Sequence, residues 1–381
     1  MKILLVGAGL SGAVTGRELA EAGHSVTVID ARAHVAGNCH TERCPETGVM
    51  VHVYGPHIFH TDDAEVWAYV NRYATFRPYR HSVMTTSRGA VYSMPVNLHT
   101  INQFFGRTMA PAEARGFIAG LAEPGPDAPV TFEEQALRFM GRDLYEAFFE
   151  GYTRKQWGCE PSALPASILK RLPLRFSYDD NYFFHRFQGM PEAGYTALVT
   201  RILDHPGIDV HLEAPFAPEV RSRYDHVFFS GPIDGFFGGR LGRLGYRTLD
   251  FERFAEEGDH QGCAVMNHPD ADTPFTRVTE HKHFAPWETH DRTVCYREYS
   301  REAGPGDIPY YPIRLVEEKR MLAEYVALAE REEGVTFLGR LGTYRYLDMD
   351  VTIREALDTA RGFLARHAQR TTQPAFAVRP L

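Results

Sequence analysis

The sequence predicts an α/β protein in which a nucleotide-binding domain, assembled from distant segments, is joined to a helical domain and an antiparallel sheet domain. Three observations predict this fold class. A β-turn-α-β unit opens the chain, buried strand-like runs return after residues 224 and 334, and the material between changes from helical to alternating periodicity. The length of 381 residues favours two or three domains, and 44% hydrophobic with 24% charged residues is typical of an ordered soluble protein of enzyme size.

The first thirty residues form the clearest unit. An apolar run from Lys2 to Val6 leads into Gly7-Ala8-Gly9-Leu10-Ser11-Gly12, a helical stretch and a second apolar run that ends at Asp30. The glycines allow a tight turn and a close approach of the backbone to a pyrophosphate, which the helix N-terminus favours. Asp30 stands where a carboxylate binds a ribose hydroxyl. Together these features predict a dinucleotide site rather than a glycine-rich turn without a ligand.

The residues after Asp30 favour FAD over NAD as the dinucleotide. The run from Ala31 to Asn38 follows without a second domain boundary and resembles the extended phosphate and ribose contacts of flavoproteins. The cofactor-binding residues expected in this part of the chain are Gly7, Gly9, Leu10, Ser11, Gly12, Asp30, Ala31, Arg32, Gly37 and Asn38.

Later segments are expected to complete the FAD-binding domain. The stretch from Tyr224 to Gly231 is typical of a buried strand that ends in small residues, and Gly334 to Arg340 is typical of another strand. A helix is expected to begin near Asp350, which we interpret as its cap. The expected segments of this domain are residues 1–76, 188–245 and 313–367.

Residues 98–165 are expected to form a mainly helical domain. The stretch from Thr131 to Glu134 has the form of a capping box, and Leu144, Phe148 and Tyr152 recur afterwards at helical spacing.

A substrate domain with an antiparallel sheet is expected from residues 77–97, 166–187 and 246–312. Its evidence is the short alternating pattern of Phe275 to Phe284 and of Thr293 to Tyr299. Residues 368–381 carry little periodicity and are expected to be a loose tail.

Charge and cysteine content argue against several classes of protein. The 41 lysines and arginines against 49 acidic residues give a formal charge of −8, which offers no global attraction for nucleic acid or anionic membranes. Five scattered cysteines without C-x-x-C spacing argue against a disulfide framework and a structural zinc site, and favour a cytoplasmic location. No apolar run reaches the roughly 18 residues that span a bilayer, and the N-terminal run is interpreted as a strand rather than a signal peptide.

Histidines and arginines supply the first candidates for chemistry. His57 and His60 lack the further ligands and spacing of a zinc site, so no metal is expected; one of them is interpreted as structural and the other as a neighbour of the flavin. Arg171 carries planar donors that suit a phosphate. Two arginines on a diphosphate would contribute several kilocalories, at about 1.5 to 3 kcal/mol for each charge-assisted hydrogen bond.

Several ordered motifs together resemble one known family. They are GAGLSG, YGPHIFHT, GYTRKQW, KRLPLRFSYDDNYF, FTRVTEHKHF, YYPI and GRLGTYRYLDMD, and the resemblance runs from residue 1 to about residue 365. This combination closely resembles the bacterial UDP-galactopyranose mutases, flavoenzymes that interconvert the pyranose and furanose forms of a nucleotide sugar. The resemblance implies FAD that is active in its reduced form: N5 of the flavin attacks the anomeric carbon, UDP leaves, and the sugar recloses as a furanose for cell-surface polysaccharide.

The resemblance also implies roles for individual residues. Arg171 and Arg277 are implied as the catalytic arginines on the diphosphate, and His57 as the catalytic histidine beside the flavin. The implied substrate-binding residues are these two arginines with Phe148, Phe149, Tyr152, Thr153, Trp157, Tyr182, Phe183, His81, Asn267, Tyr311, Tyr346 and Asp348. The implied additions to the cofactor-binding set are His57, His60, Arg340, Tyr346, Asp348 and Met349.

The sequence departs from the family pattern at two positions. Ala36 stands where glycine is usual, a small change that should still allow FAD binding, and His81 stands where many members have asparagine. His81 leaves room for a different sugar, such as UDP-N-acetylgalactosamine or a deoxysugar nucleotide. A mobile lid is expected near residues 166–176. The expected partners are a cellular reductant such as NAD(P)H and further copies of the chain, in a homodimer or higher oligomer.

Two other classes share this kind of fold. An amine-oxidase-type FAD oxidoreductase would need a dry and nearly uncharged aromatic cage, against which Arg171 and Arg277 argue. A binding module of the Rab-escort and guanine-nucleotide-dissociation-inhibitor type would lack the intact set of flavin contacts found here, and would be colourless when purified.

Overall fold

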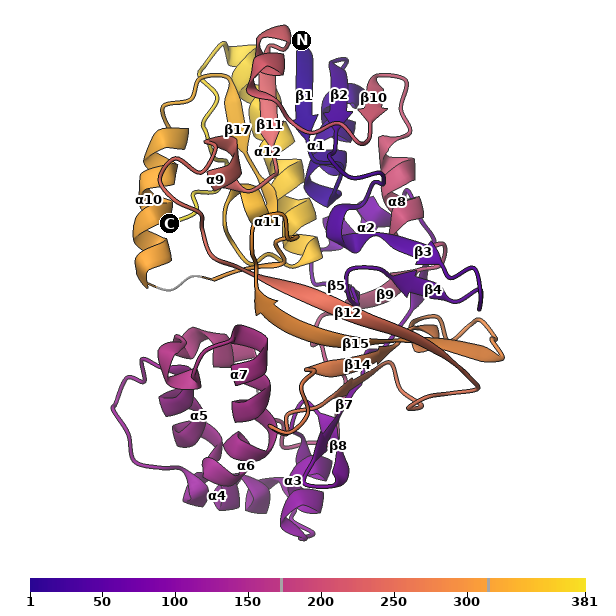
Figure 1. The fold of residues 1–381 in the computed structure, drawn as a ribbon, viewed down its shortest axis with the longest axis vertical. Helices are drawn as coiled ribbons and strands as arrows, with labels where there is room; N and C mark the ends of the chain where they lie inside the picture. The colour runs from indigo at the N-terminus through magenta and orange to yellow at the C-terminus, as the bar shows by residue number, and fades with distance from the viewer. Residues whose placement is uncertain (172–173, 314–315) are drawn as a thin grey trace.

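The computed structural model describes residues 1–171, 174–313 and 316–381, without the side chains of residues 167, 170, 171, 316 and 317. In Figure 1 an α/β nucleotide-binding domain lies above a long sheet, and a group of helices lies below it. The expected fold class is confirmed: Rossmann-like α/β with helices and a mainly antiparallel sheet. None of the helices within the described ranges is long and apolar enough to cross a membrane.

The nucleotide-binding domain is built on a parallel sheet with strand order β10-β2-β1-β11-β17. Its strands come from distant parts of the chain: β1 Lys2–Val6, β2 Ser25–Ile29, β10 Ile208–His211, β11 His226–Phe229 and β17 Val335–Phe337. Because side chains alternate along β1, its residues serve two cores. Ile3 and Leu5 pack with the first helix and the last helix, and Leu4 and Val6 pack with residues of the helix that precedes β17.

Helices cover both faces of this sheet. They are α1 Leu10–Glu21, α8 Gly194–Leu203 and α12 Met349–Gln369 on one face, with α9 Ile233–Phe236 and α10 Val316–Ala329 on the other, and α11 Gly339–Gly342 follows β17. Smaller elements connect this domain to the rest: β3 Thr41–Arg43 pairs with β4 Met50–His52, β5 Phe59–Thr61 and β6 Phe76–Pro78 flank β9 Phe187–Pro191, and α2 Ala64–Asn71 lies between them in sequence.

The second sheet has the order β16-β12-β15-β14-β13-β7-β8. Its strands are β16 Tyr311–Pro312, β12 Tyr246–Glu257, β15 Arg292–Glu302, β14 Arg277–Glu280, β13 Val265–Asn267, β7 Val83–Ser87 and β8 Ala90–Met94. All neighbours pair antiparallel except β13 and β7, which pair parallel. The sheet is thus mainly antiparallel, as expected, with one parallel pair.

The helices below the sheet come from one continuous stretch of chain. They are α3 Leu98–Phe105, α4 Pro111–Leu121, α5 Phe132–Met140, α6 Arg142–Tyr145, the π-helical turn Glu146–Glu150 and α7 Gly151–Trp157, followed by short 3₁₀ turns at Pro161–Ala163 and Ala166–Arg171. The predicted capping box is confirmed, since the Thr131 hydroxyl accepts from the Glu134 N–H while the Glu134 carboxylate accepts from the Thr131 N–H.

Local predictions near the C-terminus need correction. The run Gly334 to Arg340 is a strand only over Val335–Phe337, since Gly339 turns the chain into α11 with a φ of 72°. The cap of α12 is Asp348, not Asp350, which lies in the first turn. Phe275 to Phe284 is likewise a strand only over Arg277–Glu280, followed by a 3₁₀ turn.

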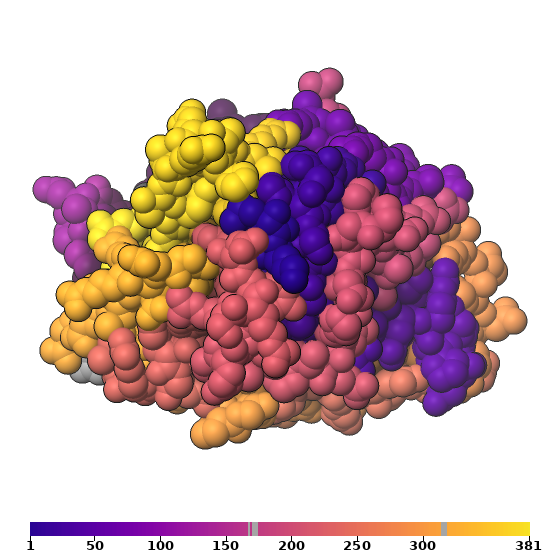
Figure 2. Space-filling model, turned by 90° about the horizontal axis from the view of Figure 1, so that it is seen from above, coloured from indigo at the N-terminus to yellow at the C-terminus, as the bar shows by residue number. Residues whose placement is uncertain are grey.

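The expected loose tail is also wrong. Phe376 is buried and forms a parallel bridge with Phe337, whose N–H donates to the Ala375 carbonyl at 2.7 Å. Figure 2 shows the first residues of the chain between the yellow C-terminal segment and the pink segments around residue 200. A buried aromatic and hydrogen bonds to β17 therefore anchor a segment whose sequence shows no periodicity.

Candidate functional site

The predicted dinucleotide motif forms one wall of a cavity at the carboxyl ends of β1, β2 and β11. Gly7 has a φ of 107°, and a Cβ added at Gly12 would lie 1.9 Å from the Gly7 carbonyl oxygen, so the turn needs glycine at both positions. The Asp30 carboxylate accepts the Ala8 N–H at 2.8 Å and the Arg32 N–H at 2.9 Å. The acid thus fixes the turn from the end of the next strand.

Arg32 shows that this cavity fits an anionic cofactor. Its Nη2 donates to Asn38 at 2.9 Å, and its guanidinium lies 4.8 Å from the centre of the Tyr54 ring. Its Nη1 is buried and has no hydrogen-bond partner among the described residues. A buried guanidinium nitrogen without an acceptor is costly, so this geometry suits the phosphate oxygens of a bound dinucleotide.

The expected cofactor residues line this cavity with one exception in the motif. Gly12 serves the tight turn and does not itself line the cavity, whereas the other motif residues do: Gly7, Gly9, Leu10, Ser11, Asp30, Ala31, Arg32, Gly37 and Asn38. His60, Tyr346 and Asp348 lie instead on a second, neighbouring cavity. The motif did not predict the part of the cavity wall that other segments form, which includes Phe216, Ser230, Gly231, Pro309 and Leu347.

Three residues line both cavities and therefore mark where they meet: His57, Arg340 and Met349. His57 Nδ1 lies 2.9 Å from the Gly55 carbonyl oxygen, and burial lowers the pKa of His57 to about 4, so its ring is neutral. Arg340 donates to the carbonyls of Tyr310 at 3.3 Å and Leu347 at 2.6 Å. Helix α12 begins at Met349, which brings the positive end of its dipole to the junction.

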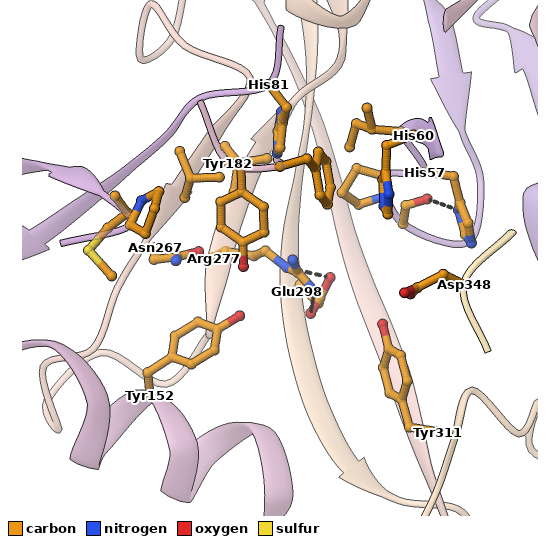
Figure 3. Close-up of a pocket in the computed structure, with 18 of the residues that line it drawn as sticks. His57, His60, His81, Tyr152, Tyr182, Asn267, Arg277, Glu298, Tyr311 and Asp348 are labelled. Carbon is orange, nitrogen blue, oxygen red and sulfur yellow. Dashed lines mark hydrogen bonds and ion pairs between the residues drawn. The ribbon is translucent and has the colours of Figure 1, made fainter. Parts of the chain in front are cut away.

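The second cavity centres on a buried ion pair between neighbouring strands (Figure 3). Arg277 of β14 donates through Nε and Nη2 to the two carboxylate oxygens of Glu298 of β15, at 2.9 and 2.8 Å. The Glu298 side chain is 1% exposed and that of Arg277 is 21% exposed. The carboxylate is thus enclosed, while the guanidinium still faces the cavity with Nη1 outside this pair.

Tyrosines surround the ion pair. Figure 3 shows the hydroxyl ends of Tyr152, Tyr182 and Tyr311 pointing toward the space around Arg277 and Glu298. Burial raises the pKa of Tyr152 to about 12 and raises the pKa of Tyr182 and Tyr311 as well. The phenols are therefore protonated at neutral pH and can donate hydrogen bonds to an anion.

His81 lies in a stack of rings at one end of this cavity. Its ring is 6.0 Å from that of Phe183, which in turn stacks on His60 at 3.7 Å. Burial and then the nearby Arg277 lower the pKa of His81 to about 3. His81 is therefore a neutral imidazole.

Most of the implied substrate residues line this cavity: Phe148, Phe149, Tyr152, Tyr182, Phe183, His81, Asn267, Arg277, Tyr311, Tyr346 and Asp348. Thr153 and Trp157 are on α7 beside them but line neither cavity in the described part of the chain. The side chain of Arg171 lies outside the described residues, as does the lid segment at 172–173. Sequence reasoning missed Glu298, which lies between Arg297 and Tyr299 in a predicted strand and is buried.

Comparisons with known proteins identify relatives of this chain. The family model for UDP-galactopyranose mutase matches residues 147–346, and the model for NAD(P)-binding Rossmann-like domains matches residues 5–73. A probable UDP-galactopyranose mutase of Klebsiella pneumoniae is 60% identical over 376 residues, which cover 99% of this chain and 98% of that protein. A dTDP-fucopyranose mutase of Escherichia coli is 52% identical over 375 residues, which cover 97% of this chain and 100% of that protein.

A solved structure of a reduced UDP-galactopyranose mutase has the same fold, with a TM-score of 0.75 at 15% identity over 96% of this chain and 95% of that one. The resemblance inferred from the motifs is thereby confirmed. On the family match and the extent of these identities, the chain belongs to the UDP-galactopyranose mutase family, a group of flavin-dependent isomerases.

Proposed function

We propose that the protein interconverts UDP-galactopyranose and UDP-galactofuranose with reduced FAD in the first cavity and the nucleotide sugar in the second. The observation that carries the proposal is the junction at His57, Arg340 and Met349, because the two cavities adjoin there. A reaction between a cofactor in one cavity and a sugar in the other requires such a junction. The product would supply furanose for cell-surface polysaccharide. A cytoplasmic location, a reductant such as NAD(P)H and a homodimer or higher oligomer belong to the same proposal.

FAD fits the first cavity through its phosphates at the turn after β1 and at Arg32, with a ribose hydroxyl at Asp30. In its reduced form the flavin would supply the nucleophile for the anomeric carbon of the sugar. The N-terminus of α12 favours negative charge at the junction, and thus an anionic reduced cofactor.

The second cavity suits a nucleoside diphosphate sugar because its hydrogen-bond donors surround the ion pair of Arg277 and Glu298. As UDP leaves, negative charge grows on the diphosphate, and donors that are already oriented stabilise it most. Arg277 is held in place by Glu298, and the neutral phenols of Tyr152, Tyr182 and Tyr311 donate without adding charge. Arg277 and Glu298 together carry almost no net charge, so a diphosphate needs a further cation. We assign this role to Arg171.

Arg171 and the lid near residues 166–176 are the part of this proposal that stands on the family resemblance. Replacement Arg171→Ala is expected to abolish most turnover while the purified protein stays yellow, since the FAD contacts are elsewhere. Retained turnover would remove Arg171 from the site.

A second candidate is a mutase for another nucleotide sugar. The 52% identity to a dTDP-fucopyranose mutase and the unusual His81 favour this candidate, with a deoxysugar nucleotide or UDP-N-acetylgalactosamine as the alternative substrate. A neutral imidazole can bond a hydroxyl or pack against a methyl group, so it does not by itself select one sugar.

A substrate panel distinguishes these candidates. The FAD-loaded protein would be incubated under reducing conditions with equal concentrations of UDP-galactofuranose, dTDP-fucofuranose and UDP-N-acetylgalactofuranosamine, and the products separated by chromatography. The proposal expects the highest kcat/KM with UDP-galactofuranose. A preference for either other sugar would replace it with the second candidate, and oxidation of an amine without any isomerisation would return the oxidase alternative.

A further inference from the structure

Lys155 of α7 makes an unusual set of contacts for a lysine in a substrate-binding region. Its ammonium donates to four main-chain carbonyls, those of His268, Asp270, Thr273 and Phe275, with distances of 3.0, 2.9 and 3.1 Å for the last three. All four belong to the loop between β13 and β14. An ammonium has three N–H donors and no acceptor, so four carbonyl oxygens within reach satisfy all of its donors, one of which is shared between two oxygens.

This loop connects two residues of the substrate cavity. It begins after Asn267, the last residue of β13, and ends before Arg277, the first residue of β14, and both line the cavity. The helix that carries Lys155 also carries Tyr152 on the same cavity. One side chain thus sets the distance between the helical wall and the sheet wall.

The contact between α7 and the loop is close at a second point. A Cβ added to Gly151 would lie 2.1 Å from the Pro269 carbonyl oxygen. The helix therefore approaches the loop as closely as its backbone allows, and glycine is required there.

A second cation joins the C-terminal end of α7 to the sheet. Arg247 of β12 is buried and donates to the carbonyls of Gln156 at 3.0 Å and Lys155 at 3.3 Å. Ser300 of β15 donates to the Gln156 carbonyl at 2.7 Å. These bonds satisfy carbonyls that a helix C-terminus leaves without partners, so α7 is held on two sides.

We propose that Lys155, supported by Arg247, is a positioning residue for the end of the substrate cavity that Tyr152 and Asn267 line, which we assign to the nucleotide. This inference rests on the proposed function, in which UDP occupies that cavity. The residues at the junction with the cofactor belong to other segments and make no contact with Lys155 among the bonds described. Arg277 at the end of the loop is also held by Glu298 and by the pairing of β14 with β15, which do not involve Lys155. Loss of the lysine should therefore weaken binding of the nucleotide with little change in the step at the sugar.

The test compares Lys155→Met with Lys319→Met, the same change at an exposed position of α10, in the FAD-loaded full chain. Calorimetry would give the Kd for UDP, and steady-state kinetics under reducing conditions would give kcat and KM. For Lys155→Met the Kd and KM should rise by about tenfold or more, with kcat within about twofold of wild type and flavin content unchanged. Lys319→Met should match wild type.

Gly151→Ala perturbs the same contact independently, because its methyl group pushes the loop and the helix apart. It should raise Kd and KM in the same way. If Lys155→Met does not fold, Gly151→Ala alone tests whether this contact sets the affinity for UDP. An unchanged Kd for UDP, or a loss of kcat that equals the loss in kcat/KM, would overturn the proposal.

Measurements on the wild-type protein distinguish failure of the proposed function from failure of the proposal for Lys155. If it binds UDP but converts no sugar, the proposed function fails while the Kd comparison still tests Lys155. If it binds no UDP, both fail.

Discussion

The two cavities are built in different ways. The cavity proposed for the cofactor has many glycine, alanine and serine residues in its wall, several of them in continuous stretches such as Gly7 to Ser11 and Asp30 to Arg32, although Phe216, Phe229 and Arg340 come from other segments. The substrate cavity collects large side chains from separate helices, strands and loops, which range from Tyr54 to Met349 in the sequence. A backbone site depends on which conformations the chain can adopt, whereas a side-chain site depends on how distant elements pack. The two should therefore fail differently when they are mutated.

Gly12→Ala is expected to have the largest effect, and only on the cofactor side. The added methyl group would lie 1.9 Å from the Gly7 carbonyl oxygen, so the turn must distort. We expect the affinity for FAD to fall by about 100-fold or more, about 2.7 kcal/mol, measured by flavin absorbance after dialysis and by titration of the apoprotein.

Gly116→Ala in α4 is the matched control, since it is exposed and has open space around it. It should keep wild-type flavin content. A Gly12→Ala protein that purifies equally yellow would contradict the view that backbone geometry defines this cavity.

Arg277→Ala should produce the opposite pattern, with flavin retained and turnover lost. It removes a donor from the diphosphate, which we expect to lower kcat by about 100-fold. It also leaves the Glu298 carboxylate buried without its partner, at a cost of about 3 to 5 kcal/mol in the free energy of unfolding.

The double variant Arg277→Ala/Glu298→Gln should regain much of this stability in urea unfolding but none of the turnover. Arg297→Ala, which breaks an exposed pair between Arg297 of β15 and Glu252 of the neighbouring strand β12, is the control and should change both quantities little. Recovery of turnover in the double variant would show that Arg277 acts only on stability.

Part of the fold and of the site could be predicted from the sequence. The β-turn-α-β unit was predictable because its strand, glycines and helix are contiguous, and strand β11 was predictable because it is a continuous apolar run. The packing of Phe376 on Phe337 and the parallel pairing of β13 with β7 were not, since both depend on contacts between distant segments. Glu298 was missed for the same reason: its partner Arg277 belongs to another strand and only the sheet register brings them together. The domain boundaries and the roles of individual site residues stay predictions.

His81→Asn should have a smaller effect that sharpens the comparison within the substrate cavity. It replaces this chain's unusual residue with the one common in the family. We expect it to change the ratio of kcat/KM between UDP-galactofuranose and dTDP-fucofuranose by up to about tenfold, with flavin content unchanged. His99→Asn, at an exposed position of α3, should leave the ratio as it is. An unchanged ratio in His81→Asn would place sugar selection elsewhere.

We expect turnover to depend little on the protonation of histidines, and the free energy of unfolding to depend on it clearly. Burial lowers the pKa of His57 to about 4, and lowers the pKa of His81 and His281 to about 3. The unfolded chain binds protons at these rings near pH 6.5, and the folded chain does not until the pH is much lower. The free energy of unfolding should therefore fall as the pH is lowered from about 6.5 toward 4, by at most about 1.4 kcal/mol per pH unit for each ring.

Urea unfolding at pH 7, 6 and 5 would check this dependence, and His81→Asn should show a shallower slope. Turnover should be free of a histidine titration between about pH 6.5 and 8, because neither His57 nor His81 changes charge there. A kinetic pKa near 6.5 that disappears in His57→Gln or His81→Asn would contradict the neutral rings.

The account rests on the two cavities acting as one site, with the sugar in contact with a reduced flavin at His57, Arg340 and Met349. The most direct test is chromatography of UDP-galactofuranose after incubation with the purified yellow protein, with and without dithionite. The account predicts conversion to UDP-galactopyranose only after reduction. Equal conversion by the oxidised protein, or none by the reduced protein while flavin and UDP are both bound, would contradict it.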